Sequence, residues 1–160
     1  MKQAFLSAAL LAVLCGCQWQ SSVQQPIQFS HKAHTEKGLP CVLCHQSVEK
    51  AASAGMPGTN ECLLCHRGAI TQNPEEEKVR QFADKGAEIP WSRVYQVRSH
   101  VYFSHRRHVT IGGVQCTACH GEVASSDTPL TKATVNLNMD TCVDCHTQRQ
   151  ASTDCDACHR

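Results

Sequence analysis

One short motif, Cys-x-x-Cys-His, occurs five times in this chain of 160 residues. The five cysteine pairs are Cys41 and Cys44, Cys62 and Cys65, Cys116 and Cys119, Cys142 and Cys145, and Cys155 and Cys158, and the histidines after them are His45, His66, His120, His146 and His159. Of the 12 cysteines, only Cys15 and Cys17 lie outside the pairs. Large apolar residues are sparse beyond the N-terminal segment, so the chain has little with which to build an ordinary hydrophobic core. Whatever the motifs bind must therefore supply much of the fold.

Cys-x-x-Cys-His is the attachment signature of haem c. The two thiols bond to the vinyl groups of the haem, and the histidine then lies beside the iron as an axial ligand. Zinc sites and thiol redox sites also use Cys-x-x-Cys, but neither needs a histidine directly afterwards. Zinc would also favour two such pairs per metal, which would leave one of the five without a partner, and a disulfide scaffold would not need such uniform spacing. The sequence therefore predicts five covalently attached haem c groups.

The number of histidines matches this prediction. The chain has 10 histidines, and the five outside the attachment motifs are His31, His34, His100, His105 and His108. Five six-coordinate irons need one further axial ligand each. The alternative for any one of these histidines is a solvated surface residue, but all five lie upstream of attachment motifs. We therefore predict that all ten histidines are iron ligands.

Four of these histidines lie in two copies of Phe-Ser-His-x-x-His, residues 29–34 and 103–108. Phe-x-His-x-x-His followed by Cys-x-x-Cys-His resembles the class III multihaem cytochromes c, which are small proteins with closely packed bis-histidine haems. The resemblance implies axial pairs of His31 with His45, His34 with His66, His105 with His120, and His108 with His146, which leaves His100 for His159. The three-haem members of that family usually have another histidine at the position of Asn138. The distal ligand of the fifth haem therefore has three alternatives, which are His100, Met139 or no ligand at all.

Residues 90–121 are also similar to the pentahaem subunit of the membrane complex called alternative complex III and to related lipoprotein cytochromes. This second resemblance implies an association with subunits of a membrane complex.

The N-terminus has the pattern of a targeting segment. Lys2 precedes the apolar run Ala4–Leu14, which is too short to span a bilayer comfortably. The following Leu-Cys-Gly-Cys resembles a bacterial lipobox, which implies cleavage before Cys17 and a lipid on that cysteine. An ordinary cleaved signal peptide is the alternative. We expect a lipoprotein signal peptide over 1–17, a flexible tether over 18–26, and a location on the periplasmic side of a bacterial membrane, inner or outer.

The remaining chain divides into two related modules. We expect a dihaem module over 27–69, a linking segment over 70–90 and a trihaem module over 91–160. The link contains a predicted helix over 74–85, because Pro74 suits a first helical position, acidic residues follow it, and Gly86 can end it. Residues 91–103 are predicted to be extended. The expected fold is mostly irregular with short α-helices, and the haems form the core. Seven apolar side chains are expected to pack on the haems: Leu39, Val42, Leu43, Leu63, Leu64, Val114 and Val143.

These features predict an electron-transfer protein without catalytic residues. Irons with two histidine ligands have no position for a substrate, and their potentials should be low. We expect a lipid-anchored carrier between a membrane quinol-oxidising complex and periplasmic or cell-surface acceptors, with redox proteins as partners. The net charge of +1 does not suggest nucleic acid. A multihaem reductase with one open haem site and a structural haem-bearing subunit are the alternatives. The donor, the acceptor, the order of haem potentials and the oligomeric state are left open.

Overall fold

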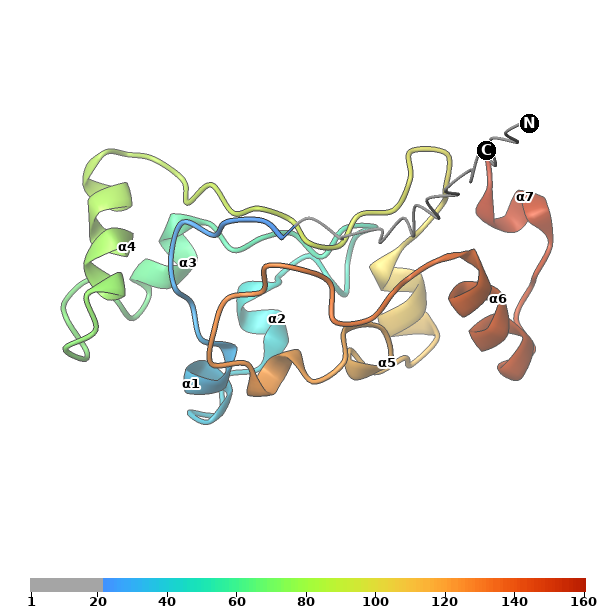
Figure 1. Ribbon diagram of the computed structural model, residues 1–160, viewed down its shortest axis with the longest axis horizontal. Coiled ribbons are helices and arrows are strands. Elements are labelled where there is room, and N and C mark those ends of the chain that lie inside the picture. Colours follow the sequence, from blue (N-terminus) through green and yellow to red (C-terminus); the bar gives the residue numbers. More distant parts are fainter. Residues whose placement is uncertain (1–21) are drawn as a thin grey trace, which may run out of the picture.

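The computed structural model describes residues 22–160, which form an elongated molecule of short helices joined by irregular chain (Figure 1). The helices are α1 (His31–Thr35), α2 (Cys41–Cys44), α3 (Thr59–Leu63), α4 (Glu75–Asp84), α5 (Thr117–His120), α6 (Met139–Gln148) and α7 (Cys155–Cys158), with a π-helical turn at Arg107–Ile111 and a 3₁₀ turn at Val123–Ser125. The expected irregular, short-helix fold is confirmed. The predicted signal peptide and the lipidated Cys17 lie outside the described residues.

The segment 91–103, which was predicted to be extended, forms no strand. The backbone of this segment pairs with the C-terminus in an isolated antiparallel bridge between Val101 and His159. Within residues 22–160, no helix combines the length and the apolar character needed to cross a membrane.

Helix α4 agrees closely with the predicted linking helix, but it packs against the first module. Pro74 precedes it and Gly86, with φ of 60°, follows it. The helix lies beside α3, and Val79 joins Ile27 and Ile89 in a small buried cluster. The segment after α4 is therefore held to the first module by apolar contacts and does not run freely between the modules.

Hydrogen bonds between loops join the two halves of the chain. Ala51 and Ala52 of the first half accept backbone hydrogen bonds from Arg106 and His105 at 3.0 and 2.9 Å. On another side, Gln25 donates its side-chain amide to the carbonyl groups of Ser92 and Leu130, both at 2.8 Å. These contacts fix the two halves so that they overlap at the middle of the molecule, where the Val123–Ser125 turn of the second half lies beside α1 (Figure 1).

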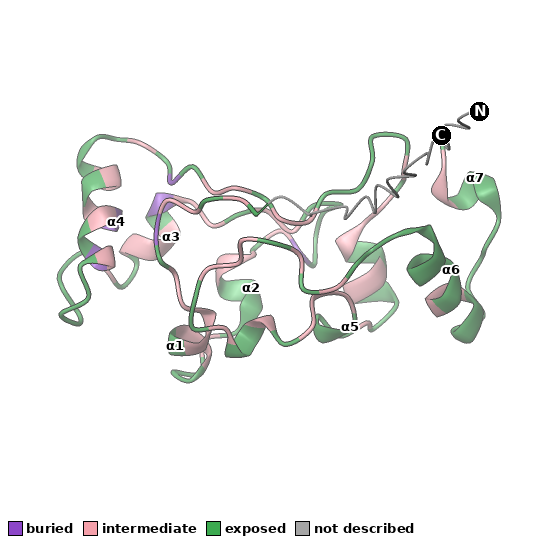
Figure 2. Cartoon of the chain, in the orientation of Figure 1, coloured by how far each residue is buried: buried purple, intermediate pink, exposed green. Residues whose placement is uncertain are grey.

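Few side chains are buried by protein atoms alone. Among the described residues the buried apolar side chains are Ile27, Val48, Val79 and Ile89, and Figure 2 shows how little of the chain is buried. Apolar side chains beside the attachment motifs are open, such as Leu64 at 66% and Val143 at 40% exposure. This pattern fits a protein whose interior is completed by large apolar cofactors.

We predict that Ile89→Ala lowers the free energy of unfolding by about 2–5 kcal/mol, because it empties part of the small buried cluster. Ile70, which is 57% exposed, provides the control. Ile70→Ala should change the free energy by less than about 0.5 kcal/mol. Denaturant unfolding followed by far-ultraviolet circular dichroism measures both. Similar losses in the two variants would contradict the role of the cluster.

Candidate haem sites

Four of the attachment motifs close a helical turn of their own, and the fourth lies within the longer helix α6. The backbone N–H of His45 donates to the carbonyl of Cys41 at 2.9 Å, and the corresponding bond from His159 to Cys155 is 2.8 Å. His66 and His120 make the same contact with the first cysteine of their motifs, both at 2.9 Å. Residues three and four positions apart lie on one face of a helical turn. Both sulfurs and the imidazole therefore lie on the same side, as attachment of one haem requires.

The structure brings the five upstream histidines next to the five motif histidines. Ring centroids are 6.1 Å apart for His34 and His66, 6.3 Å for His105 and His120, 6.1 Å for His108 and His146, and 5.6 Å for His100 and His159. His31 lies near His45. Burial lowers the pKa of His31, and His45 is the next cause.

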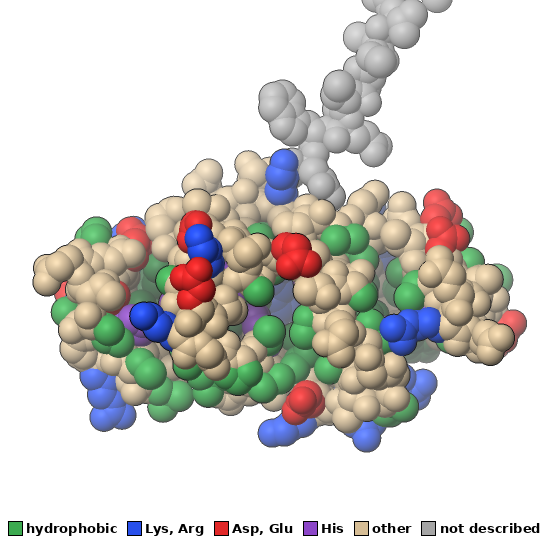
Figure 3. Space-filling model, turned by 90° about the horizontal axis from the view of Figure 1, so that it is seen from below, with side chains coloured by type: hydrophobic (Ala, Val, Ile, Leu, Met, Phe, Trp, Pro, Cys, Tyr) green, Lys and Arg blue, Asp and Glu red, His purple; other side chains and the backbone are tan. Residues whose placement is uncertain are grey.

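These separations fit two imidazoles that hold one iron between them. A metal–nitrogen bond of about 2 Å on each side, and about 1 Å from nitrogen to ring centre, would put the centroids about 6 Å apart. The rings of His105 and His120 are nearly parallel, with an interplanar angle of 4°. Figure 3 shows histidine side chains between hydrophobic ones on one face of the molecule, which suits an apolar macrocycle. The residues present therefore fit haem c.

The two Phe-Ser-His-x-x-His segments adopt the same local geometry. The ring of Phe29 meets His31 edge-on at 4.9 Å and stacks on His34 at 4.6 Å. Phe103 repeats both contacts, at 4.8 Å with His105 and 4.7 Å with His108. One aromatic ring thus orients two histidines that reach different attachment motifs.

His100 reaches the last attachment motif through the bridge at Val101. The N–H of Arg160 donates to the carbonyl of His100 at 3.0 Å, and the N–H of Tyr102 donates to Cys158 at 2.7 Å. These bonds hold the rings of His100 and His159 together. Met139 is the first residue of α6 and is 65% exposed.

Asn138, which occupies the position of a family histidine, has a different role here. Its side chain accepts a hydrogen bond from the N–H of Thr141 at 2.9 Å. The hydroxyl of Thr141 in turn accepts from the N–H of Asn138 at 2.9 Å, which completes a capping box. The residue therefore starts α6, the helix that carries the fourth motif.

Backbone carbonyl groups orient five of the ten histidine rings. The Nδ1 atoms of His34 and His108 contact the carbonyl groups of Ser30 and Ser104, each at 2.8 Å. The same contact is 3.0 Å for His45, 2.9 Å for His105 and 2.6 Å for His146, with Gly55, Ala52 and Ser152 as the carbonyl partners. A proton held on Nδ1 leaves Nε2 free for a metal.

His66 has a carboxylate beside it instead. The Oε2 atom of Glu76 lies 3.6 Å from its Nδ1 atom. Hydrogen bonds from the Thr71 hydroxyl, the Ile70 N–H and the Thr71 N–H, together with the nearby His66, lower the pKa of Glu76 to about 2. The sequence had suggested only that Glu76 favours the start of α4. Val79 and Phe82 follow Glu76 on the predicted helix, and this pattern does not indicate a contact between Glu76 and a histidine ten residues earlier in the chain.

The attachment motifs lie near one another in a definite order. Burial raises the pKa of Cys62 to about 11, and the nearby Cys44 thiol is the next cause. Burial also raises the pKa of Cys116, followed by its charge interaction and hydrogen bond with Cys41. The second motif thus neighbours the first, and the first neighbours the third.

The same order continues toward the C-terminus. Burial raises the pKa of Cys119, and the thiols of Cys145 and Cys142 raise it further. Burial raises the pKa of Cys142, with Cys158 as the next cause. Along the long axis of Figure 1 the motif-bearing helices accordingly follow the order α3, α2, α5, α6 and α7.

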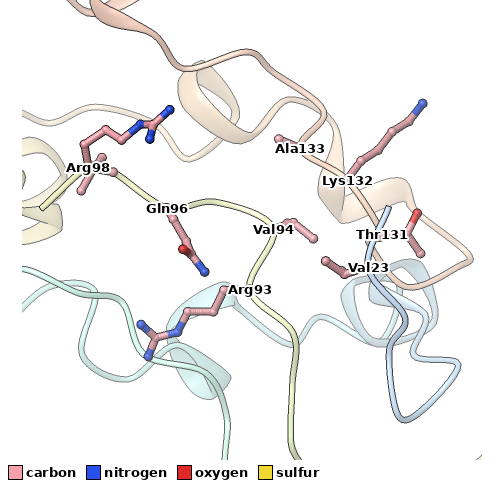
Figure 4. Close-up of a pocket in the computed structure, with 9 residues that line it drawn as sticks. Val23, Arg93, Val94, Gln96, Arg98, Thr131, Lys132 and Ala133 are labelled. Carbon is pink, nitrogen blue, oxygen red and sulfur yellow. The ribbon is translucent and has the colours of Figure 1, made fainter. Parts of the chain in front are cut away.

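A separate hollow of about 570 Å³ opens beside the chain that joins the modules. Arg93, Arg98 and Lys132 lie along it, together with Val23 and Val94 (Figure 4). No attachment cysteine or histidine of the described chain lines it. The two arginines and the lysine give this part of the surface a positive charge.

Comparison with known proteins assigns the chain to a family. The family of cytochrome c7 and related cytochrome c matches residues 27–86 and again residues 101–160. The chain belongs to this family of multihaem cytochromes c. It therefore binds haem c covalently and transfers electrons, and the expected two related modules are confirmed. The menaquinone reductase, multiheme cytochrome c subunit of Nitratidesulfovibrio vulgaris strain Hildenborough is 33% identical over 168 residues, which cover 88% of this chain and 79% of that protein.

Tyr95 positions His120 and provides a test of the site. Its ring meets His120 edge-on at 4.6 Å, and its hydroxyl accepts hydrogen bonds from the N–H groups of Thr134 and Val135 at 2.9 and 3.1 Å. We predict that Tyr95→Phe lowers the free energy of unfolding by about 1–3 kcal/mol, because these donors lose their acceptor.

Tyr102→Phe is the matched control, since no hydrogen bond of the Tyr102 hydroxyl occurs within residues 22–160 and the residue is 54% exposed. Denaturant unfolding of the two variants measures the difference. Equal stability of both variants would contradict the positioning role of the Tyr95 hydroxyl.

Proposed function

We propose that this chain is a pentahaem electron-transfer protein. It carries electrons between a membrane complex that exchanges electrons with quinones and redox proteins of the periplasm or the cell surface. The observation that carries the proposal is the row of five histidine pairs, each beside one Cys-x-x-Cys turn. Haem c supplies one-electron chemistry when bound.

Each site uses two cysteines for attachment and two histidines for the iron. The pairs are His31 with His45, His34 with His66, His105 with His120, His108 with His146, and His100 with His159. Two imidazoles saturate the iron, which leaves no position for a substrate. The chain itself therefore performs no substrate chemistry.

The order of the motifs along the long axis defines the path of the electrons. The site at Cys62 lies at one end and the site at Cys155 at the other. Electrons pass through the second, first, third, fourth and fifth sites in that order. The contact between Cys41 and Cys116 supports this path, because it brings the two modules together at their first attachment motifs.

The partner at one end is a membrane complex that exchanges electrons with quinones. The 33% identity to a subunit of a menaquinone reductase supports this assignment. A lipid on Cys17 would hold the carrier at the periplasmic side of a bacterial membrane, within reach of such a complex. The end of the expected tether 18–26 is not flexible, because Val23 and Gln25 are hydrogen-bonded to the second half of the chain.

We predict that the mature protein has five covalent haem increments and an acylated N-terminal Cys17 in its intact mass. Cys17→Ala should remove the acyl increment and release the protein from membranes, while the five haems stay attached. Mass spectrometry and membrane fractionation measure these outcomes. Fewer than five haems would contradict the pentahaem assignment, and an unmodified Cys17 would contradict the lipid anchor.

We predict that His100→Ala converts one haem of five from low-spin to high-spin ferric iron. Met139→Ala, the control for the rival ligand, should leave all five low-spin. Electron paramagnetic resonance of the oxidised protein measures the spin states. The wild-type signal should also stay unchanged on addition of nitrite, cyanide or sulfite. A wild-type high-spin signal that shifts with these anions would favour a reductase with an open haem site.

A further inference from the structure

We propose that Glu76 is an electrostatic positioning residue for His66 and makes the haem at Cys62 and Cys65 the lowest-potential site of the row. The inference rests on the proposed function, since it concerns the potential of one of five bis-histidine haems. It also gives electron transfer along the row a preferred direction, because the affected haem site lies at one end of the row.

The carboxylate of Glu76 is fixed in place beside the imidazole. It is buried, at 8% exposure, and its Oε2 atom lies 3.6 Å from Nδ1 of His66. Oε2 also accepts a hydrogen bond from the N–H of Ile70 at 2.8 Å. Oε1 accepts from the N–H and the hydroxyl of Thr71 at 3.0 and 2.6 Å. Three donors in a confined space hold the ionised form and prevent the side chain from turning away.

The Nδ1 atom of His66 depends on this carboxylate for a partner. The atom is shielded from solvent and makes no hydrogen bond within residues 22–160. The carboxylate of Glu76, with Oε2 3.6 Å away, lies beside it. In contrast, Nδ1 of His34, the histidine facing His66, contacts the neutral carbonyl of Ser30 at 2.8 Å.

The other sites differ from this one in charge. At the first, third and fourth motifs, the histidines with a defined Nδ1 partner contact backbone carbonyl groups. A carbonyl orients the ring but carries no net charge. Within the described chain, His66 is the histidine whose ring lies within salt-bridge distance of a carboxylate.

The neighbouring glutamates of α4 have cations of their own. Glu75 pairs with Lys78 at 2.7 Å, and Glu77 pairs with Arg80 at 2.7 Å. No lysine or arginine of the described chain forms a salt bridge with Glu76. Within the described chain, no cationic lysine or arginine side chain therefore neutralises the charge of Glu76 beside the imidazole.

A negative charge at Nδ1 favours the oxidised iron. It increases the basicity of the ligating ring, as carboxylate–histidine pairs do at metal sites, and it stabilises the additional positive charge of the ferric state. The midpoint potential of this site should therefore be lower than that of sites whose rings contact carbonyl groups. Electrons that arrive at the α3 end then move toward higher potential in the direction of α7.

The test is a potentiometric titration of the intact pentahaem protein, followed by visible absorbance and analysed as five one-electron steps. Glu76→Gln should raise the lowest step, with about a tenfold change in the ferric-to-ferrous ratio, or about 59 mV. The other four steps should change much less. His34→Met, which alters the distal ligand at the same site, should raise that same step and so assign it.

Three further variants separate the electrostatic effect from other causes. Glu77→Gln removes an identical charge from an exposed position of the same helix and should leave the lowest step in place. Glu76→Asp keeps the charge, so the potential of its lowest step should lie between those of the wild type and Glu76→Gln. Thr71→Val removes the 2.6 Å hydrogen bond but keeps the carboxylate, so it should shift the step less than Glu76→Gln.

Equal shifts for Glu76→Gln and Glu77→Gln, a uniform shift of all five steps, or no shift would each overturn the inference. A shift in Thr71→Val as large as that in Glu76→Gln would assign the effect to loosening of the loop and would also overturn it. Intact mass and electron paramagnetic resonance of every variant keep the two proposals distinct. Five low-spin haems without a selective shift contradict the role of Glu76 alone, whereas fewer haems or high-spin iron in the wild type contradict the proposed function.

Discussion

The closure of one helical turn within each Cys-x-x-Cys-His is the constraint on which this structure depends. The bond from the histidine N–H to the first cysteine carbonyl puts two sulfurs and an imidazole on one face. Five such turns fix where the cofactors attach, and little other regular structure is needed. The scarcity of buried side chains follows, because a chain that wraps haems needs few apolar contacts with itself.

The second organising contact is the phenylalanine that lies between two histidines. Phe29 and Phe103 hold one ring edge-on and one ring stacked, with nearly the same distances in both modules. Because the two histidines of each pair reach different motifs, each phenylalanine ties together two neighbouring sites. This local unit explains why the duplication is visible both in the sequence and in the geometry.

The local features of the fold were predictable from the sequence, but its long-range contacts outside the histidine pairs were not. The spacing of the cysteines predicted the attachment turns, and the Pro74 and Gly86 signals predicted α4 to within a residue at each end. The four pairings around the Phe-Ser-His-x-x-His segments came from the family resemblance. The approach of His100 to His159 depends on a single bridge, which carries no periodic signal. The contact of Glu76 with His66 depends on how α4 packs against α3, and the start and stop signals that predicted the helix carry no information on this packing.

The order of the attachment motifs in space differs from their order in the chain. The two modules meet at the first motif of each, where Cys41 lies beside Cys116, and their later motifs point in opposite directions. The two ends of the row are unequal, because α4 packs beside α3 at the second motif, whereas most of α7 at the fifth motif is exposed. The row is therefore asymmetric, with one end shielded by a packed helix and the other open to approach from solvent.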